Sequence, residues 1–176
     1  MQINSSLHLF VLTYTILTSL LFPNGVIAQN DATSKDPDSS FNSLFISDLE
    51  RRVFALINAQ RIQNGLKPLI WNELAAETAR LQSRNMASYN FFNHVGVDGK
   101  RVDDRADSVG LHKWRMIGEN LAYNRGFSNP IERVVESWMK STEHSKNVLR
   151  KNWRESGVGI SVTPNGTYFF TQVFIR

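Results

Sequence analysis

The first helical pattern of the chain follows Ser47. Apolar side chains then recur three and four positions apart, which places them on one helix face: Leu49, Val53, Leu56 and Ile57. Ser47 at the N-cap and Glu50 three positions later form a capping box, and Gly65 is typical of a helix end. We therefore predict a helix from Ser47 to about residue 64.

Three more helices are predicted further along the chain. Asn72 is a suitable N-cap for a helix that continues to about Met86, and Pro130 suits the first position of another. The apolar face of the helix that begins at Pro130 consists of Ile131, Val134, Val135, Trp138 and Met139. A short helix is expected over residues 142–149. Residues 91–118 are predicted to be mostly loop, with a short helical piece near 102–109.

The last part of the chain has the pattern of a β-hairpin. Residues 157–162 and 167–175 are strand-like, and the turn between them contains Asn165 and Gly166, for which we expect left-handed backbone angles. Both strands are apolar on both faces, so helices must cover the sheet on both sides. We therefore predict an α+β fold, an α-β-α sandwich with a small antiparallel sheet between helices.

The N-terminal residues resemble a secretory signal peptide. An apolar run over residues 7–22 is shorter than the roughly 20 residues that a membrane-spanning helix needs. It is followed by a helix-breaking segment and by a site that suits cleavage after Ala28. A retained membrane anchor is the alternative, because no Lys or Arg precedes the run. We favour a secreted protein with a signal peptide at 1–28, a flexible polar leader at 29–45 and one domain at 46–176.

Composition narrows the range of functions. The chain has no cysteine, so neither disulfides nor a lipoprotein anchor are expected, and the domain must be stabilised by its core. Lys and Arg outnumber Asp and Glu by 20 to 16, but they are scattered along the sequence. This predicts a solvated surface with at most weak attraction to anionic envelope polymers or lipid head groups. Nothing indicates a nucleic-acid-binding module, and we expect a monomer.

Three residues in short, recognisable contexts carry the candidate chemistry. His94 lies in FNHVG, Glu119 in GENLA, and His144 follows the segment WMKSTE. This order resembles the CAP superfamily, named for cysteine-rich secretory proteins, antigen 5 and pathogenesis-related 1 proteins. The cysteine-free bacterial branch, often called SCP-like extracellular proteins, is the closer match. The resemblance covers about residues 49–175 and also implies the α-β-α sandwich.

In that family two histidines and a glutamate from distant segments meet in one cleft. The resemblance implies that His94 and His144 are ligands of a divalent metal such as zinc, and that Glu119 acts as the base if the protein is an enzyme. The alternative is structural, with histidines that hold loops in place and a glutamate that braces the cleft. Ser141 occupies the place of a second cleft glutamate of many eukaryotic members, and Glu143 replaces a common glycine. His112 is expected on the surface.

We therefore predict a binding or interaction module. Its cleft would hold a metal ion or a small ligand, such as a lipid or a component of the cell envelope. The alternatives are a metal-assisted, protease-like hydrolase that uses the same cleft, and an extracellular scaffold with an inert cleft. A serine hydrolase is disfavoured, because Ser141 and Ser145 beside His144 lie in no nucleophile-elbow motif.

Overall fold

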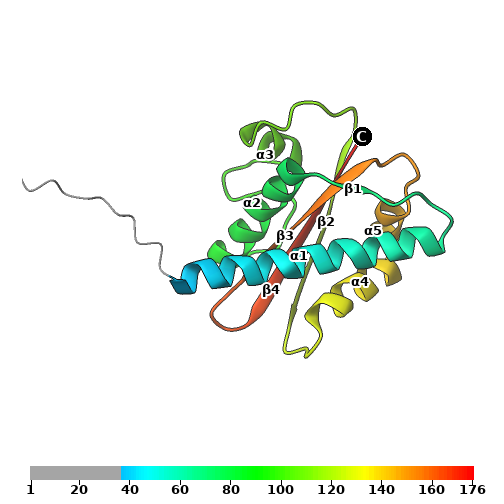
Figure 1. Ribbon diagram of the computed structural model, residues 1–176. Helices are drawn as coiled ribbons and strands as arrows, with labels where there is room; N and C mark the ends of the chain where they lie inside the picture. Colours follow the sequence, from blue (N-terminus) through cyan, green and yellow to red (C-terminus); the bar gives the residue numbers. More distant parts are fainter. Residues whose placement is uncertain (1–36) are drawn as a thin grey trace, which may run out of the picture. The chain divides into compact units, whose positions relative to one another are not determined.

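The computed structural model describes residues 37–176, with side chains from residue 42 onward. Within this range it contains α1 (Pro37–Gln63), β1 (Ile70–Trp71), α2 (Glu73–Tyr89), α3 (Val102–Ser108), β2 (Ile117–Arg125), α4 (Pro130–Lys140), α5 (Thr142–Val148), β3 (Glu155–Val162) and β4 (Thr167–Ile175) (Figure 1). The predicted signal peptide, its cleavage site and the first part of the leader lie outside the described residues. None of the described helices is long and apolar enough to cross a membrane.

The four strands form one sheet with helices on both faces. Its order is β1-β3-β4-β2, so β1 and β2 are the edge strands. Helices α2 and α3 cover one face, while α1, α4 and α5 cover the other (Figure 1). This confirms the α+β sandwich. The sheet is mixed rather than purely antiparallel, because β1 pairs with β3 in parallel, and the strands β1 and β2 were not predicted.

Alternate residues of β4 belong to two different cores. Phe170 and Phe174 pack into the cluster that includes α1 and α4, whereas Val173 and Ile175 pack with α2 and α3. Trp138 of α4 is fully buried in the first cluster, as predicted, and its indole Nε1 donates a hydrogen bond to the carbonyl of Leu121 at 3.0 Å. The predicted apolar face of α4 is therefore confirmed, and it faces the sheet.

Helix α2 packs directly on β3 at two glycines. A Cβ atom on Gly157 would lie 2.1 Å from the backbone nitrogen of Ala76, and one on Gly159 would lie 2.1 Å from that of Arg80. Ser83 adds a hydrogen bond from its hydroxyl to the carbonyl of Gly159 at 2.8 Å. Only glycine permits this approach, so the two glycines set the distance between α2 and the sheet.

The predicted start of the first helix is wrong. Helix α1 begins at Pro37, so it includes residues 37–45 that the sequence assigned to the leader, and Ser47 is not an N-cap. Glu50 has a tertiary role instead, since its carboxylate accepts hydrogen bonds from Arg80 at 2.7 Å and from the backbone N–H of Ile160 at 3.1 Å. Burial raises the pKa of the Glu50 carboxyl, while Arg80 opposes this shift.

The β3–β4 turn differs in one detail from its prediction. Gly166 is left-handed, with φ of 79°, but Asn165 is not among the residues with positive φ. The Gly166 N–H donates to the carbonyl of Thr163, and the Thr163 N–H donates to the carbonyl of Thr167, both at 2.9 Å. This is a three-residue loop that ends in a left-handed glycine. Pro164 takes the first loop position, which moves Asn165 to a position that needs no positive φ.

The close contact between α2 and β3 predicts a large effect of one methyl group. Gly159→Ala should lower the free energy of unfolding by about 3 kcal/mol or more, because the methyl meets backbone atoms that cannot move aside. Gly126→Ala is the matched control, since its Cβ meets nothing and only the positive φ of 79° costs about 1 kcal/mol. Urea unfolding followed by tryptophan fluorescence measures both. Equal losses would show that the contact is not limiting.

Candidate functional site

Glu119 lies on the edge strand β2 and connects a buried cation to a surface imidazole. Its side chain is 3% exposed. Arg105 of α3 donates from Nη2 to Oε2 at 2.6 Å, and His94 Nδ1 lies 2.8 Å from Oε1. Both carboxylate oxygens therefore have partners. The arrangement neutralises a buried charge and at the same time orients His94.

Arg105 fastens the loop that carries His94. Its side chain is 2% exposed, and Nη1 donates to the carbonyls of His94 at 3.2 Å and Lys100 at 2.9 Å. From α2, Gln82 donates to the carbonyl of Asn93 at 2.5 Å. The loop between α2 and α3 is thus held from two helices and, through Glu119, from the sheet.

The contact with Glu119 determines which ring nitrogen of His94 is available. A carboxylate only accepts hydrogen bonds, so Nδ1 carries the hydrogen and Nε2 keeps its lone pair. The side chain of His94 is 57% exposed, so the ring is open to solvent on the side away from Glu119. A histidine fixed by a carboxylate in this way is typical of metal sites.

His144 is positioned from the backbone. It lies in the first turn of α5, whose N-cap Ser141 accepts a hydrogen bond from the His144 N–H. Asn120 of β2 donates to the carbonyl of His144 at 3.1 Å, and Asn147 donates to the carbonyl of Glu119 at 3.3 Å and to Asn120 Oδ1 at 2.9 Å. These amides fasten α5 to β2 directly beside Glu119.

The surroundings of His144 favour its neutral form. Burial lowers the pKa of His144, the neighbouring His94 lowers it further, and Glu143 has the opposite effect. His144 is therefore neutral at pH 7. Among the described residues its ring makes no hydrogen bond to either His94 or Glu119. The structure thus brings His94 into contact with Glu119 and places His144 nearby.

The residues that depart from the family pattern have structural roles. Ser141, in the place of a second cleft glutamate, caps α5. The side chain of Glu143 is 81% exposed and pairs with Lys146 at 3.0 Å rather than with the imidazole of His144. His112 is exposed and lies 3.2 Å from Asp107, so its predicted surface position is confirmed.

An aromatic hollow adjoins the His94 loop. The ring centroids of Phe92 and Tyr123 are 5.1 Å apart, and those of Tyr123 and Phe169 are 6.0 Å apart. With Asn90 and Arg125 they line a cavity of about 380 Å³. This volume is near the lower end of the range for small-molecule sites. Tyr123 and Glu119 point to the same face of β2, because they are four residues apart on one strand.

Sequence reasoning missed several residues that build this site. Arg105 was not predicted to belong to the site, because an arginine is ordinarily exposed unless it is paired. Asn147 and Gln82 gave no signal, since a polar residue on a helix is ordinarily exposed. Their partners come from distant segments, so only the folded chain shows that these side chains hold the site together.

The sequence matches a known protein family. The sequence model of the cysteine-rich secretory protein family, CAP, matches residues 54–174, a range that contains His94, Glu119 and His144. The chain belongs to the CAP family. Two Bacillus subtilis proteins are similar over most of this CAP chain. YkwD is 38% identical over 130 residues, which cover 74% of the chain and 48% of YkwD. YlbC, named as a membrane protein, is 32% identical over 127 residues, which cover 72% of the chain and 34% of YlbC.

Solved structures include similar CAP domains. An extracellular protein of Bacillus anthracis that contains an SCP domain matches with a TM-score of 0.68 and 26% identity, over 80% of this chain and 44% of its own. An outer surface protein of Borrelia burgdorferi matches with a TM-score of 0.66 and 16% identity, over 73% and 92%, which shows the shared fold alone. The chain spans about half or less of the length of the Bacillus relatives.

The buried ion pair predicts strong coupling between Arg105 and Glu119. Arg105→Ala should lower the free energy of unfolding by about 3–5 kcal/mol, because it leaves a buried carboxylate without its cation. The double variant Arg105→Met/Glu119→Leu should lose clearly less than the sum of the two single variants Arg105→Met and Glu119→Leu. Urea unfolding of the parent, these two single variants and the double variant provides the double-mutant cycle. Additive losses would contradict the coupling.

Proposed function

We propose that this CAP protein is a secreted binding module whose site at His94 and His144 takes a divalent metal ion or a small ligand. The contact between His94 Nδ1 and Glu119 is the observation that carries the proposal. It leaves Nε2 of an exposed imidazole as a fixed acceptor, and His144, whose pKa burial and His94 both lower, would supply a second, neutral imidazole. The extracellular B. anthracis relative and the signal-like residues 1–28 support secretion.

The donor set fits a weakly held metal ion. His94 and His144 would hold it through imidazole nitrogen, and Glu119 would act behind His94 as the orienting carboxylate. Among the described residues, no group of three His, Cys, Asp or Glu side chains is arranged to hold a metal. Water or a bound ligand would therefore complete the coordination of zinc, which when bound supplies a Lewis acid. We expect modest affinity.

The contacts of Glu119 favour binding over the alternative hydrolase. Both of its oxygens already accept hydrogen bonds, so the uptake of a substrate proton would disrupt the buried pair with Arg105. Glu119 is better suited to position His94 than to act as a general base. The aromatic hollow beside the loop offers room for the apolar part of a ligand.

Zinc titration tests the metal site. Isothermal titration calorimetry at pH 7.5 should show zinc binding that is lost in His94→Ala and in His144→Ala, because each variant removes one of two protein ligands. His112→Ala is the matched control and should bind normally, since His112 is an exposed histidine paired with Asp107. Affinity should fall below about pH 6, because protonated imidazole cannot ligate. No heat of binding in the parent protein, or equal loss in the control, would refute the site.

Export is a separate prediction. Expression in a secreting bacterial host should release protein that begins at Gln29, because residues 26–28 suit signal-peptidase cleavage. N-terminal sequencing of the released protein measures this directly. Protein that stays in the membrane fraction with Met1 intact would instead support a retained anchor.

A further inference from the structure

The basic side chains of the protein fall into two groups. Nineteen Lys and Arg residues lie in the range whose side chains are described, and nine of them form ion pairs with Asp or Glu. Arg61 is buried and donates to backbone carbonyls. The other nine have no ion pair with an Asp or Glu of the described residues: Lys67, Arg101, Lys113, Arg115, Arg125, Arg150, Lys151, Arg154 and Arg176.

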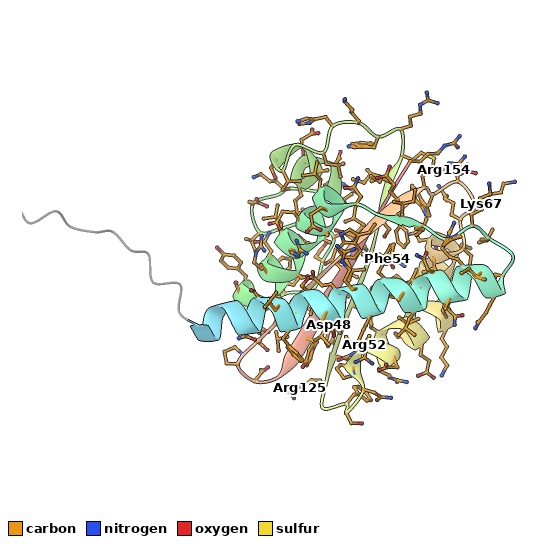
Figure 2. The ribbon with its side chains drawn as sticks, in the orientation of Figure 1. Asp48, Arg52, Phe54, Lys67, Arg125 and Arg154 are labelled. Carbon is orange, nitrogen blue, oxygen red and sulfur yellow. The ribbon has the colours of Figure 1, made fainter. Side chains whose placement is uncertain are left out.

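Six of these nine residues gather on one surface, which we call the basic face: Lys67, Lys113, Arg115, Lys151, Arg154 and Arg176. They line two hollows of about 500 and 390 Å³ that share Arg154. Among the described residues, no Asp or Glu lines either hollow. Figure 2 shows Lys67 and Arg154 close to each other at one end of the molecule, well apart from Arg125.

Backbone hydrogen bonds hold three of these residues, Arg115, Arg154 and Arg176, at one end of the sheet. The N–H groups of Arg115 and Met116 both donate to the carbonyl of Arg176, and the N–H of Arg154 donates to the carbonyl of Ile175 at 3.0 Å. The loop before β2, the residue before β3 and the end of β4 therefore meet at one end of the sheet. The positive charge of the basic face is built into the fold, although its members are scattered along the sequence.

We propose that the basic face binds a linear polyanion in which phosphate groups repeat along the chain and which carries no bases. The two hollows joined at Arg154 offer cations over an extended path, which suits a chain with regularly spaced charges better than a single small anion. Four of the six cations belong to one hollow and three to the other, with Arg154 in both. The site is separate from His94 and His144 and does not depend on the proposed function.

The same surface is poorly suited to a nucleic acid or a lipid bilayer. Single-stranded nucleic acid is usually bound with exposed aromatic stacking platforms, whereas Trp114 is half-buried and Trp153 is buried. Insertion into a bilayer needs several exposed apolar side chains. Ile70 is the one exposed large apolar residue that lines either hollow. The basic face therefore suits a ligand that is recognised mainly by its negative charge.

Binding of linear polyphosphate to the purified full chain tests the proposal. Calorimetric titrations at about 50 and 200 mM salt should show affinity falling roughly 30-fold, as expected for the release of counterions from three to four neutralised phosphates. The variant Arg115→Gln/Arg154→Gln should bind about tenfold more weakly at the lower salt concentration, with a shallower salt dependence. Within the described part of the chain, neither side chain forms a hydrogen bond or an ion pair. Both arginines bond to the fold through their backbone N–H groups.

Arg101→Gln/Arg125→Gln is the matched control. It removes the same two charges from exposed, unpaired arginines outside the basic face, so its binding should equal that of the parent. Equal weakening in both double variants would show that net charge alone attracts the polymer, and would overturn the proposal. Absence of binding, or tighter binding to a single-stranded oligonucleotide or to phosphatidylglycerol vesicles than to polyphosphate, would overturn it too.

Discussion

The direct contact of α2 with β3 is the constraint on which the rest of the described structure depends. Gly157 and Gly159 let the helix backbone lie against the strand, where any Cβ would meet it at 2.1 Å. The position of α2 determines where the next loop begins, and that loop carries His94. Because the chain has no disulfide, such close packing takes over the task of fixing one layer on the other. The candidate site is therefore precise only if this helix cannot shift.

Two buried carboxylates complete the connection between helices and sheet. Glu50 of α1 joins Arg80 of α2 and the N–H of Ile160 in β3, and Glu119 of β2 joins Arg105 of α3. Each pair is costly to break, because the remaining partner would be a buried, uncompensated charge. Glu50 connects three elements of the fold. Glu119 serves both the fold and the site, since its second oxygen orients His94, so a loss of activity in a Glu119 variant needs a stability measurement beside it.

The sequence predicted those parts of the fold in which apolar periodicity is undisturbed. The helices α2, α4 and α5, the strands β3 and β4 and the two-sided cover of the sheet all follow from it. Strand β2 escaped prediction because Glu119, Asn120 and Asn124 are buried polar residues whose partners lie far away in the sequence. The helix start predicted from a capping box at Ser47 was wrong for a related reason, since Glu50 has its partners in α2 and β3.

The short sequence motifs predicted which residues form the candidate site, but they did not predict the separate role of each residue. A pattern of two histidines and one glutamate is compatible with three equal ligands, whereas the Arg105 contact makes Glu119 an orienting group and leaves the imidazoles as the exposed donors. The basic face was even less predictable from the sequence, because it depends on which cations lack acidic neighbours in space. Arg80 and Arg133 pair with glutamates, whereas Arg154 and Arg176 have no acidic partner among the described residues. Unpaired charge is thus a property of the fold, and the strands that position Glu119 also gather the cations at the end of the sheet where β2 begins.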